Sequence, residues 1–148
     1  MKYSNLFLMA ALSFISMYIL MYIMVNEFAN VYSNLNQLYM AGVMTIPMVL
    51  IDLFLMRSMY NNKKFNAVIG TLSLAIFIVL IIFVRKQTAI SDREFLKSMI
   101  PHHASALLMC EQSSLQDPEI KKLCESISSS QQSEIDFMKA KLRTLEAK

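Results

Sequence analysis

The sequence contains few helix-breaking residues and little charge. Its 148 residues include only two glycines, three prolines, two cysteines and two histidines. So little glycine and proline excludes collagen-like and disordered classes, and 55% of the residues are hydrophobic. The chain also lacks a nucleophile–base pair, a phosphate-binding loop and a redox-cofactor motif. We therefore expect no enzymatic activity, and we expect no nucleic-acid partner.

Charge is nearly missing from three long apolar runs in the first part of the chain, at 6–25, 38–56 and 67–84. Each is long enough for a helix to cross a bilayer, which takes about 20 residues. The first run is too long for a signal peptide and no small-x-small cleavage site follows it, so it is expected to remain as an anchor. Asp52 lies inside the second run, and its expected partner is Arg57 or a lysine of the following loop. Residues 1–87 are therefore predicted to form a three-span region in a lipid bilayer.

Positive charge is absent from the loop after the first run, VNEFANVYSNLNQ. The loop after the second run, RSMYNNKKF, contains one arginine and two lysines. The positive-inside rule then places the N-terminus and the second loop in the cytoplasm, and the first loop and residues 88–148 outside, although Arg85 and Lys86 run against it. The expected location is a bacterial inner or plasma membrane, with the C-terminal domain in the periplasm if the bacterium is Gram-negative.

Two helices are predicted in residues 88–148. Ser91 and Glu94 form a capping-box pattern, which starts a helix that runs to about Ser113. Asp117 followed by Pro118 marks a second start, and no glycine or proline interrupts the chain after it. The short connection makes the helices antiparallel. We expect an all-α chain: three transmembrane helices followed by an extramembrane antiparallel hairpin.

A hairpin this small cannot bury enough apolar surface to be stable alone. It therefore needs a partner. We favour a second copy, in a homodimer with a four-helix bundle, over the outer face of the membrane spans.

Both histidines stand side by side in the stretch MIPHHASALLMC. At about 100° per residue, the imidazole and sulfur donors of this helix all lie within one third of its circumference. Pro101, directly before the histidines, is expected to kink the helix and so re-aim them. These donors are Met99, His102, His103, Met109 and Cys110.

The second helix carries two polar residues, Gln131 and Glu134, in an otherwise apolar stripe. Folding the hairpin at residues 115–116 places both opposite the histidine pair. A carboxylate there would fix the tautomer of an imidazole and leave its other nitrogen free as a ligand. Met138 lies further along the same stripe, where it would serve a second ion or another subunit.

Thioether and imidazole donors together favour monovalent copper, or silver as its mimic. Zinc would require more thiolates or carboxylates, and a di-iron site would require Glu-x-x-His elements that the chain lacks. Other interpretations stay open: the methionines as core residues, the histidines as a polar layer held by Glu134, and Glu134 as a solvated charge. Cys110 and Cys124 could be small buried residues, a disulfide in an oxidising compartment, or additional soft ligands.

The run DREFLKSMIPHHASALLMC from Asp92, with DPEIKKL from Asp117 and QQSEIDFM from Gln131, resembles the domain-of-unknown-function 305 family of bacteria. Its hallmarks are Met-x-x-His-His and Gln-x-x-Glu-Ile-x-x-Met. The resemblance implies a ferritin-like helical bundle, export and a role in copper binding or resistance. This chain departs from the soluble exported members because it has a single hairpin and three spans. The metal-binding positions that the resemblance implies are Met99, His102, His103, Met109 and Met138.

The expected function is that of a membrane-anchored copper(I)-binding protein for copper tolerance or delivery, with a copper-handling partner protein. Two alternatives remain. In one, the chain is a metal-ion transport component whose methionines line two faces of the spans. In the other, it is a structural or assembly subunit without metal. The methionines of the two faces are Met17, Met21 and Met24, and Met40, Met44 and Met48.

Overall fold

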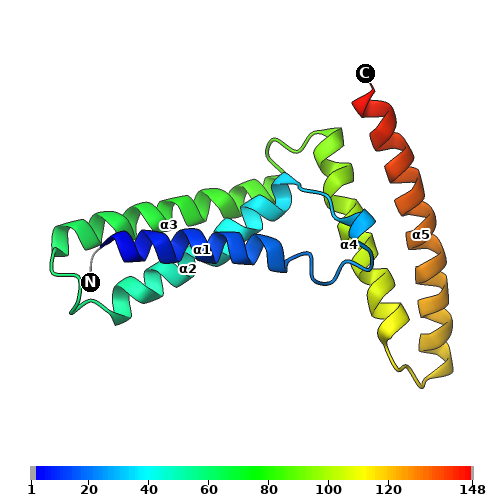
Figure 1. Ribbon diagram of the computed structural model, residues 1–148, viewed down its shortest axis with the longest axis horizontal. Coiled ribbons are helices and arrows are strands. Elements are labelled where there is room, and N and C mark those ends of the chain that lie inside the picture. Colours follow the sequence, from blue (N-terminus) through cyan, green and yellow to red (C-terminus); the bar gives the residue numbers. More distant parts are fainter. Residues whose placement is uncertain (1–2, 148) are drawn as a thin grey trace. The chain divides into compact units, whose positions relative to one another are not determined.

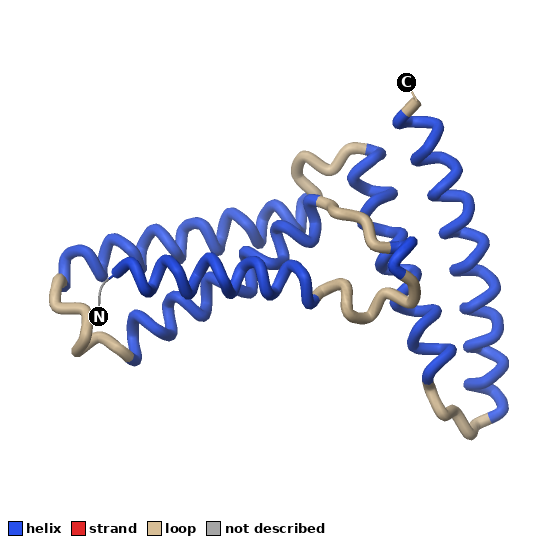
Figure 2. Tube along the Cα trace, in the orientation of Figure 1, coloured by secondary structure: helices blue, strands red, loops and turns tan. Residues whose placement is uncertain are grey.

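The chain is largely helical in residues 3–147, which are the residues that this computed structural model describes (Figure 1). Those residues contain no strand (Figure 2), so the prediction of an all-α chain is confirmed. The elements are α1 (Tyr3–Leu20), a short 3-10 helix η1 (Phe28–Asn30), α2 (Leu35–Leu55), α3 (Lys63–Lys86), α4 (Asp92–Gln112) and α5 (Pro118–Glu146).

The chain divides into two compact units. The first consists of Met1–Met21 and Asn36–Ala89, and the second of Tyr22–Leu35 and Ile90–Lys148. The second unit thus combines α4 and α5 with the segment between α1 and α2, which the sequence pattern had assigned to the spanning region. We call this segment, Tyr22–Leu35, the α1–α2 loop.

Three helices of the first unit are long and apolar enough to cross a membrane, as the sequence predicted. Mean hydropathy over an 18-residue window is 1.6 in α1, 2.0 in α2 and 3.0 in α3. The bounds differ most in α1, which ends at Leu20 although apolar sequence continues to Val25. The Tyr22 hydroxyl donates a hydrogen bond of 2.7 Å to the Tyr32 carbonyl, which closes the α1–α2 loop just beyond this helix.

The first unit packs through a small apolar cluster and one close helix approach. The cluster consists of Leu6, Leu53, Tyr60 and Ile69, which come from α1, α2, the α2–α3 connection and α3. Gly42 of α2 is buried, and a Cβ atom added there would lie 2.7 Å from a methyl carbon of Leu80. Small residues that let helices approach are typical of membrane helix interfaces.

The partner of Asp52 differs from the one expected. The Tyr60 hydroxyl donates a hydrogen bond of 2.8 Å to its carboxylate, whereas the Arg57 guanidinium lies 5.8 Å from the centre of the Phe54 ring. The expectation of an arginine or lysine partner was therefore wrong. A neutral hydroxyl satisfies the carboxylate without the cost of desolvating a second charge.

The predicted starts of α4 and α5 are confirmed by their caps. The Ser91 hydroxyl accepts a hydrogen bond from the Glu94 backbone N–H, and the Asp117 carboxylate accepts two, from Glu119 and Ile120. A capping box also predicts that the side chain of Glu94 accepts from the backbone N–H of Ser91, and this half of the prediction is wrong. The Glu94 carboxylate instead accepts a hydrogen bond of 2.8 Å from the backbone N–H of Leu35, a distant part of the chain.

Helices α4 and α5 pack side by side in opposite directions (Figure 1). A Cys110–Cys124 disulfide joins them next to their connection. At the other end, the Arg93 guanidinium donates to the Leu145 carbonyl, and Lys97 lies 3.6 Å from Glu146. The core between them contains Leu96, Ile100, Ala104, Leu107, Ile135, Met138 and Leu142.

The α1–α2 loop satisfies a backbone group that Pro101 leaves free. Pro101 lies inside α4 and has no N–H, so the carbonyl of Lys97, four residues earlier, loses its helical donor. The buried Asn34 side chain donates a hydrogen bond of 3.4 Å to that carbonyl. Val25 and Tyr32 of the same loop pack against the hairpin core.

Replacing Asn34 with leucine should therefore loosen the second unit. The Lys97 carbonyl is part-buried, so the loss of its donor should cost about 1 kcal/mol, at the low end of the range for a buried group. Hydrogen–deuterium exchange of the full chain in detergent should show faster exchange around Pro101 and in the α1–α2 loop. Exchange in α3 serves as the internal control. Unchanged protection around Pro101 would contradict this role for Asn34.

Candidate functional site

The two histidines occupy different environments on α4. His103 points toward α5 and its side chain is 12% exposed, whereas His102 is exposed. The His103 Nδ1 atom lies 3.0 Å from a carboxylate oxygen of Glu134, a contact that the predicted hairpin register anticipated. The two atoms are close enough for an ion pair but are not aligned as a hydrogen bond. The two imidazole centres are 6.0 Å apart.

His103 should be a neutral imidazole near pH 7. Burial lowers its pKa below the usual 6.5, the Glu134 carboxylate opposes this shift, and His102 adds to it. A neutral ring has one nitrogen without a proton, which can accept a hydrogen bond or act as a ligand.

This shift makes the stability of the metal-free second unit depend on pH. The unfolded chain takes up a proton at His103 more readily than the folded chain does. The neutral His103 side chain therefore makes its full contribution to the free energy of unfolding above about pH 6.5. That contribution is lost as the pH falls through the pKa of His103 in the folded chain, which lies below the unfolded value. Hydrogen exchange, corrected for its intrinsic pH dependence, should report weaker protection of α4 and α5 in acid. His103→Gln should flatten that dependence, and an unaltered slope would contradict it.

The sulfur donors do not all share the environment of the histidines. Met99, one turn before them, is half-buried against the hairpin core. Met109 is 56% exposed, and Met138 is only 6% exposed and belongs to the core itself. Gln131 is half-buried on α5, one turn before Ile135. Of the three methionines, Met99 is the one that helical spacing places beside both imidazoles.

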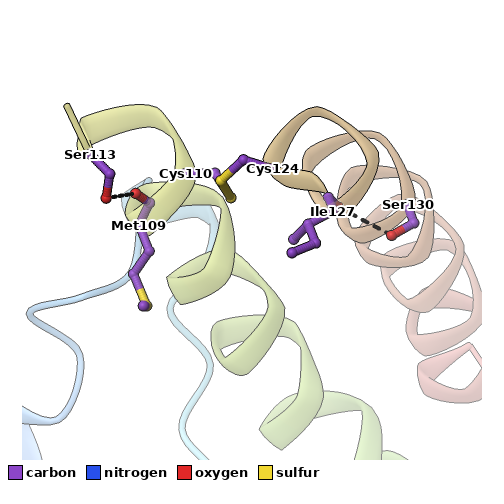
Figure 3. Close-up of a disulfide and its surroundings, with 6 residues drawn as sticks. All are labelled: Met109, Cys110, Ser113, Cys124, Ile127 and Ser130. Carbon is purple, nitrogen blue, oxygen red and sulfur yellow. Dashed lines mark hydrogen bonds between the residues drawn. A yellow bond between two sulfur atoms is a disulfide. The ribbon is translucent and has the colours of Figure 1, made fainter. Parts of the chain in front are cut away.

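The cysteines are paired with each other (Figure 3). Cys110 of α4 and Cys124 of α5 form a disulfide, with their Cα atoms 5.4 Å apart. Metal binding requires a thiolate, so the idea that these residues are additional soft ligands is wrong for this structure. Of the alternatives that the sequence left open, the disulfide is the one observed.

The donor set that remains consists of His102, His103 and Met99 at helical spacings of three and four residues, with Glu134 behind His103. Within residues 3–147 no three His, Cys, Asp or Glu side chains converge as a metal cluster would require. Two imidazoles and a thioether do not satisfy zinc, which prefers four nitrogen, sulfur or carboxylate ligands. They do fit a soft monovalent ion, which accepts imidazole and thioether ligands.

Comparison with known proteins places the hairpin in a family. The family described as Domain of unknown function (DUF305) matches residues 84–146. The chain is also 33% identical over 141 residues to "Uncharacterized protein L153" of Acanthamoeba polyphaga mimivirus, covering 93% of this chain and 91% of that protein. The likeness to L153 therefore includes the apolar helices as well as the hairpin. No solved structure matches the chain. The chain belongs to the DUF305 family, whose domain here comprises α4, α5 and their immediate approach.

Proposed function

We propose that this protein is a membrane-anchored copper(I)-binding protein, with His102, His103 and Met99 as its ligands. The observation that carries the proposal is the contact between His103 and Glu134. The Glu134 carboxylate lies 3.0 Å from His103 Nδ1, and a small rotation of the ring would form the N–H···carboxylate hydrogen bond that orients a ligand imidazole and leaves Nε2 free. The adjacent His102 is exposed and accessible to an ion from solution. The proposed role is copper tolerance or delivery to a partner protein.

We further propose that the second unit, a half-bundle of the ferritin-like kind, lies on the exported side of its membrane. Disulfides persist in oxidising compartments, and Cys110 and Cys124 form one. The α1–α2 loop belongs to the same unit as the hairpin, as three successive spans would require. Because L153 is a viral protein, the proposal concerns the side of the membrane and not the organism.

Competition titration tests the binding site. The full chain in detergent micelles is titrated with copper(I) against a chromophoric chelator. We expect the wild-type chain to withdraw copper from the chelator and the His102→Ala/His103→Ala variant to lose this ability. Glu134→Gln should weaken binding by about 10–100-fold, since it removes a group that supports the ligands without being one. Equal binding by the wild type and the double histidine variant would exclude this site.

Metal transport is a second candidate, favoured by one observation in the first unit. Met9, Met17 and Met48 line one shallow pocket between α1 and α2, together with Ser13 and Ser16. This candidate predicts copper uptake by vesicles containing the protein and loss of uptake in Met17→Leu/Met48→Leu. Equal uptake by that variant would remove it.

A further inference from the structure

One face of the α4–α5 hairpin exposes several large apolar side chains. On both helices its residues stand one position before the residues that face the partner helix. On α4 this face contains Phe95, Met99, His102, Ala106 and Met109, and on α5 it contains Leu123, Ile127, Ser130, Glu134, Phe137 and Lys141. We call this set the open face. Its residues alternate in steps of four and three, the repeat by which helices pack along a seam.

The two halves of the open face lie on the same side of the hairpin. In a pair of antiparallel helices, the residue before each core position points to the same side of the pair on both helices. This is so because the second helix runs in the opposite direction and also faces the opposite way. The contact between His103 and Glu134 crosses this edge and confirms the geometry.

Large apolar side chains are exposed on this face. Phe95 is 50% exposed, Met109 56%, Leu123 58% and Phe137 69%. Within residues 90–147 the other exposed large apolar residue is Ile120, at the start of α5. A monomer rarely displays such a set on one side of two helices without a use for it.

The opposite side of the hairpin differs. On α5 it consists of Glu125, Ser129, Gln132, Asp136, Lys139 and Arg143, all of them polar. On α4 the α1–α2 loop supplies contacts, through Asn34 and the Lys97 carbonyl. The contrast shows that the open face is a specific surface and not a general property of these helices.

We infer that the open face binds the open face of a second copy of this chain, and that the two hairpins form a four-helix bundle. The two copies are related by a two-fold axis parallel to the helices. In that arrangement α4 of one copy packs antiparallel on α5 of the other, as in four-helix bundles generally. The interface is self-complementary, as a two-fold dimer requires.

The levels of the residues along the hairpin support this pairing. Three contacts fix which residues of α4 and α5 share a level: Cys110 with Cys124, His103 with Glu134, and Arg93 with Leu145. A two-fold axis parallel to the helices does not shift residues along the bundle, so residues that share a level within one copy also share it between copies. Phe95 and Met99 of one copy then meet Phe137 of the other, and Met109 meets Ile127. Ala106 meets Ser130, small against small, and His102 meets Glu134, imidazole against carboxylate.

A lipid surface is a poorer match for this face. Its charged residues are one lysine, Lys141, and one glutamate, Glu134, whereas surface-bound helices carry lysine and arginine around an apolar face. A second copy also supplies what the single chain lacks. The middle layer would then contain His102, His103 and Glu134 from both chains, so an ion would have four imidazoles within reach. This consequence rests on the proposed function, whereas the interface itself does not.

Cross-linking of the full chain in detergent or lipid nanodiscs tests the interface, with a chelator present so that metal plays no part. Chains carrying Ala106→Cys are mixed with chains carrying Ser130→Cys and then oxidised. We expect a disulfide-linked species of twice the chain mass, with peptide mapping showing that position 106 of one copy is bonded to position 130 of the other. Ser129→Cys is the matched control, because Ser129 is exposed on the polar side of α5. It should give no such product.

A second variant tests the apolar contact. Phe137→Glu should shift the chain from dimer to monomer in light scattering of the purified particle, and Gln132→Glu on the polar side should leave the dimer intact. A chain that is monomeric at all concentrations, or that links equally through residues 129 and 130, would overturn the inference, as would burial of Phe137 in lipid without any cross-link. The His102→Ala/His103→Ala variant should still cross-link. Loss of copper binding in a dimer that persists, or copper binding by a monomer, would therefore separate the two proposals.

Discussion

Replacing Ile135 with alanine is expected to lower the free energy of unfolding of the second unit by about 2–5 kcal/mol. Ile135 is fully buried, at 0% exposure, in the cluster that joins α4 to α5. Alanine would remove the transfer energy of three carbons and leave a cavity between two helices that cannot fully close it. The effect is large because the core between the helices is small, with only seven buried residues in the whole cluster.

The matched control is the same change at Ile120, which is 49% exposed in the first turn of α5. That substitution removes no core contact, so it should alter stability by about 0.5 kcal/mol or less. Hydrogen–deuterium exchange of the full chain measures both effects, because local protection reports the free energy of opening of each helix. Exchange in α4 and α5 should rise in Ile135→Ala while α3 stays unchanged. Equal effects at residues 120 and 135 would show that the core lies elsewhere.

The helices could be predicted because their signals are local. Apolar runs and caps such as Ser91 and Asp117 depend on residues a few positions apart, and the structure places helices where these patterns indicated. Glu134 could be placed opposite the histidines for a related reason, since a short connection and helical periodicity together determine the register of a hairpin.

The contacts between distant segments could not be predicted. Nothing near Glu94 indicates that its carboxylate would bind the backbone of Leu35, and nothing near Asn34 indicates the carbonyl that Pro101 leaves free. Both bonds depend on how the α1–α2 loop folds back on α4. The same holds for Asp52, whose hydrogen-bond partner Tyr60 comes from beyond the end of α2.

The sequence predicted the positions of the site's two histidines better than it predicted which methionines lie beside them. A helical wheel places Met109 and His102 on the same side of α4, but it does not show which part of that side α5 covers. Met138 satisfies the pattern of a ligand and of a core residue equally, and the structure places it in the core. The open face was also present in the sequence, in Phe95 and Phe137. It was hidden because these residues stand directly beside core positions.

The α5 part of the hairpin core is concentrated in the half of that helix far from the connection. On α5 the buried residues are Ile135, Met138 and Leu142, all in the second half of the helix. The first half contains the serine-rich stretch SISSSQQS and no fully buried residue. At this end the Cys110–Cys124 disulfide holds the two helices together where apolar contacts are few.

Removing the disulfide should therefore unfold this end first. The bond joins residues separated by 14 positions in the sequence. In the chain-entropy account, losing a cross-link over a loop of this size lowers the free energy of unfolding by about 3 kcal/mol, because the unfolded chain gains conformational freedom. Cys110→Ser/Cys124→Ser should lose exchange protection in the last turn of α4 and the first half of α5. Protection at Ile135 and Leu142 should fall less, because their apolar contacts remain.

Reductant supplies the control for this prediction. Dithiothreitol should reproduce the effect in the wild-type chain and change nothing in the double serine variant, which separates loss of the bond from loss of the sulfur atoms. On α5, Glu134 lies between Cys124 and the buried residues, so its contact with His103 should weaken when the connection end opens. The copper affinity proposed above should then fall on reduction. Protection that is equal in reduced and oxidised chains would show that the hairpin needs no covalent support at its connection.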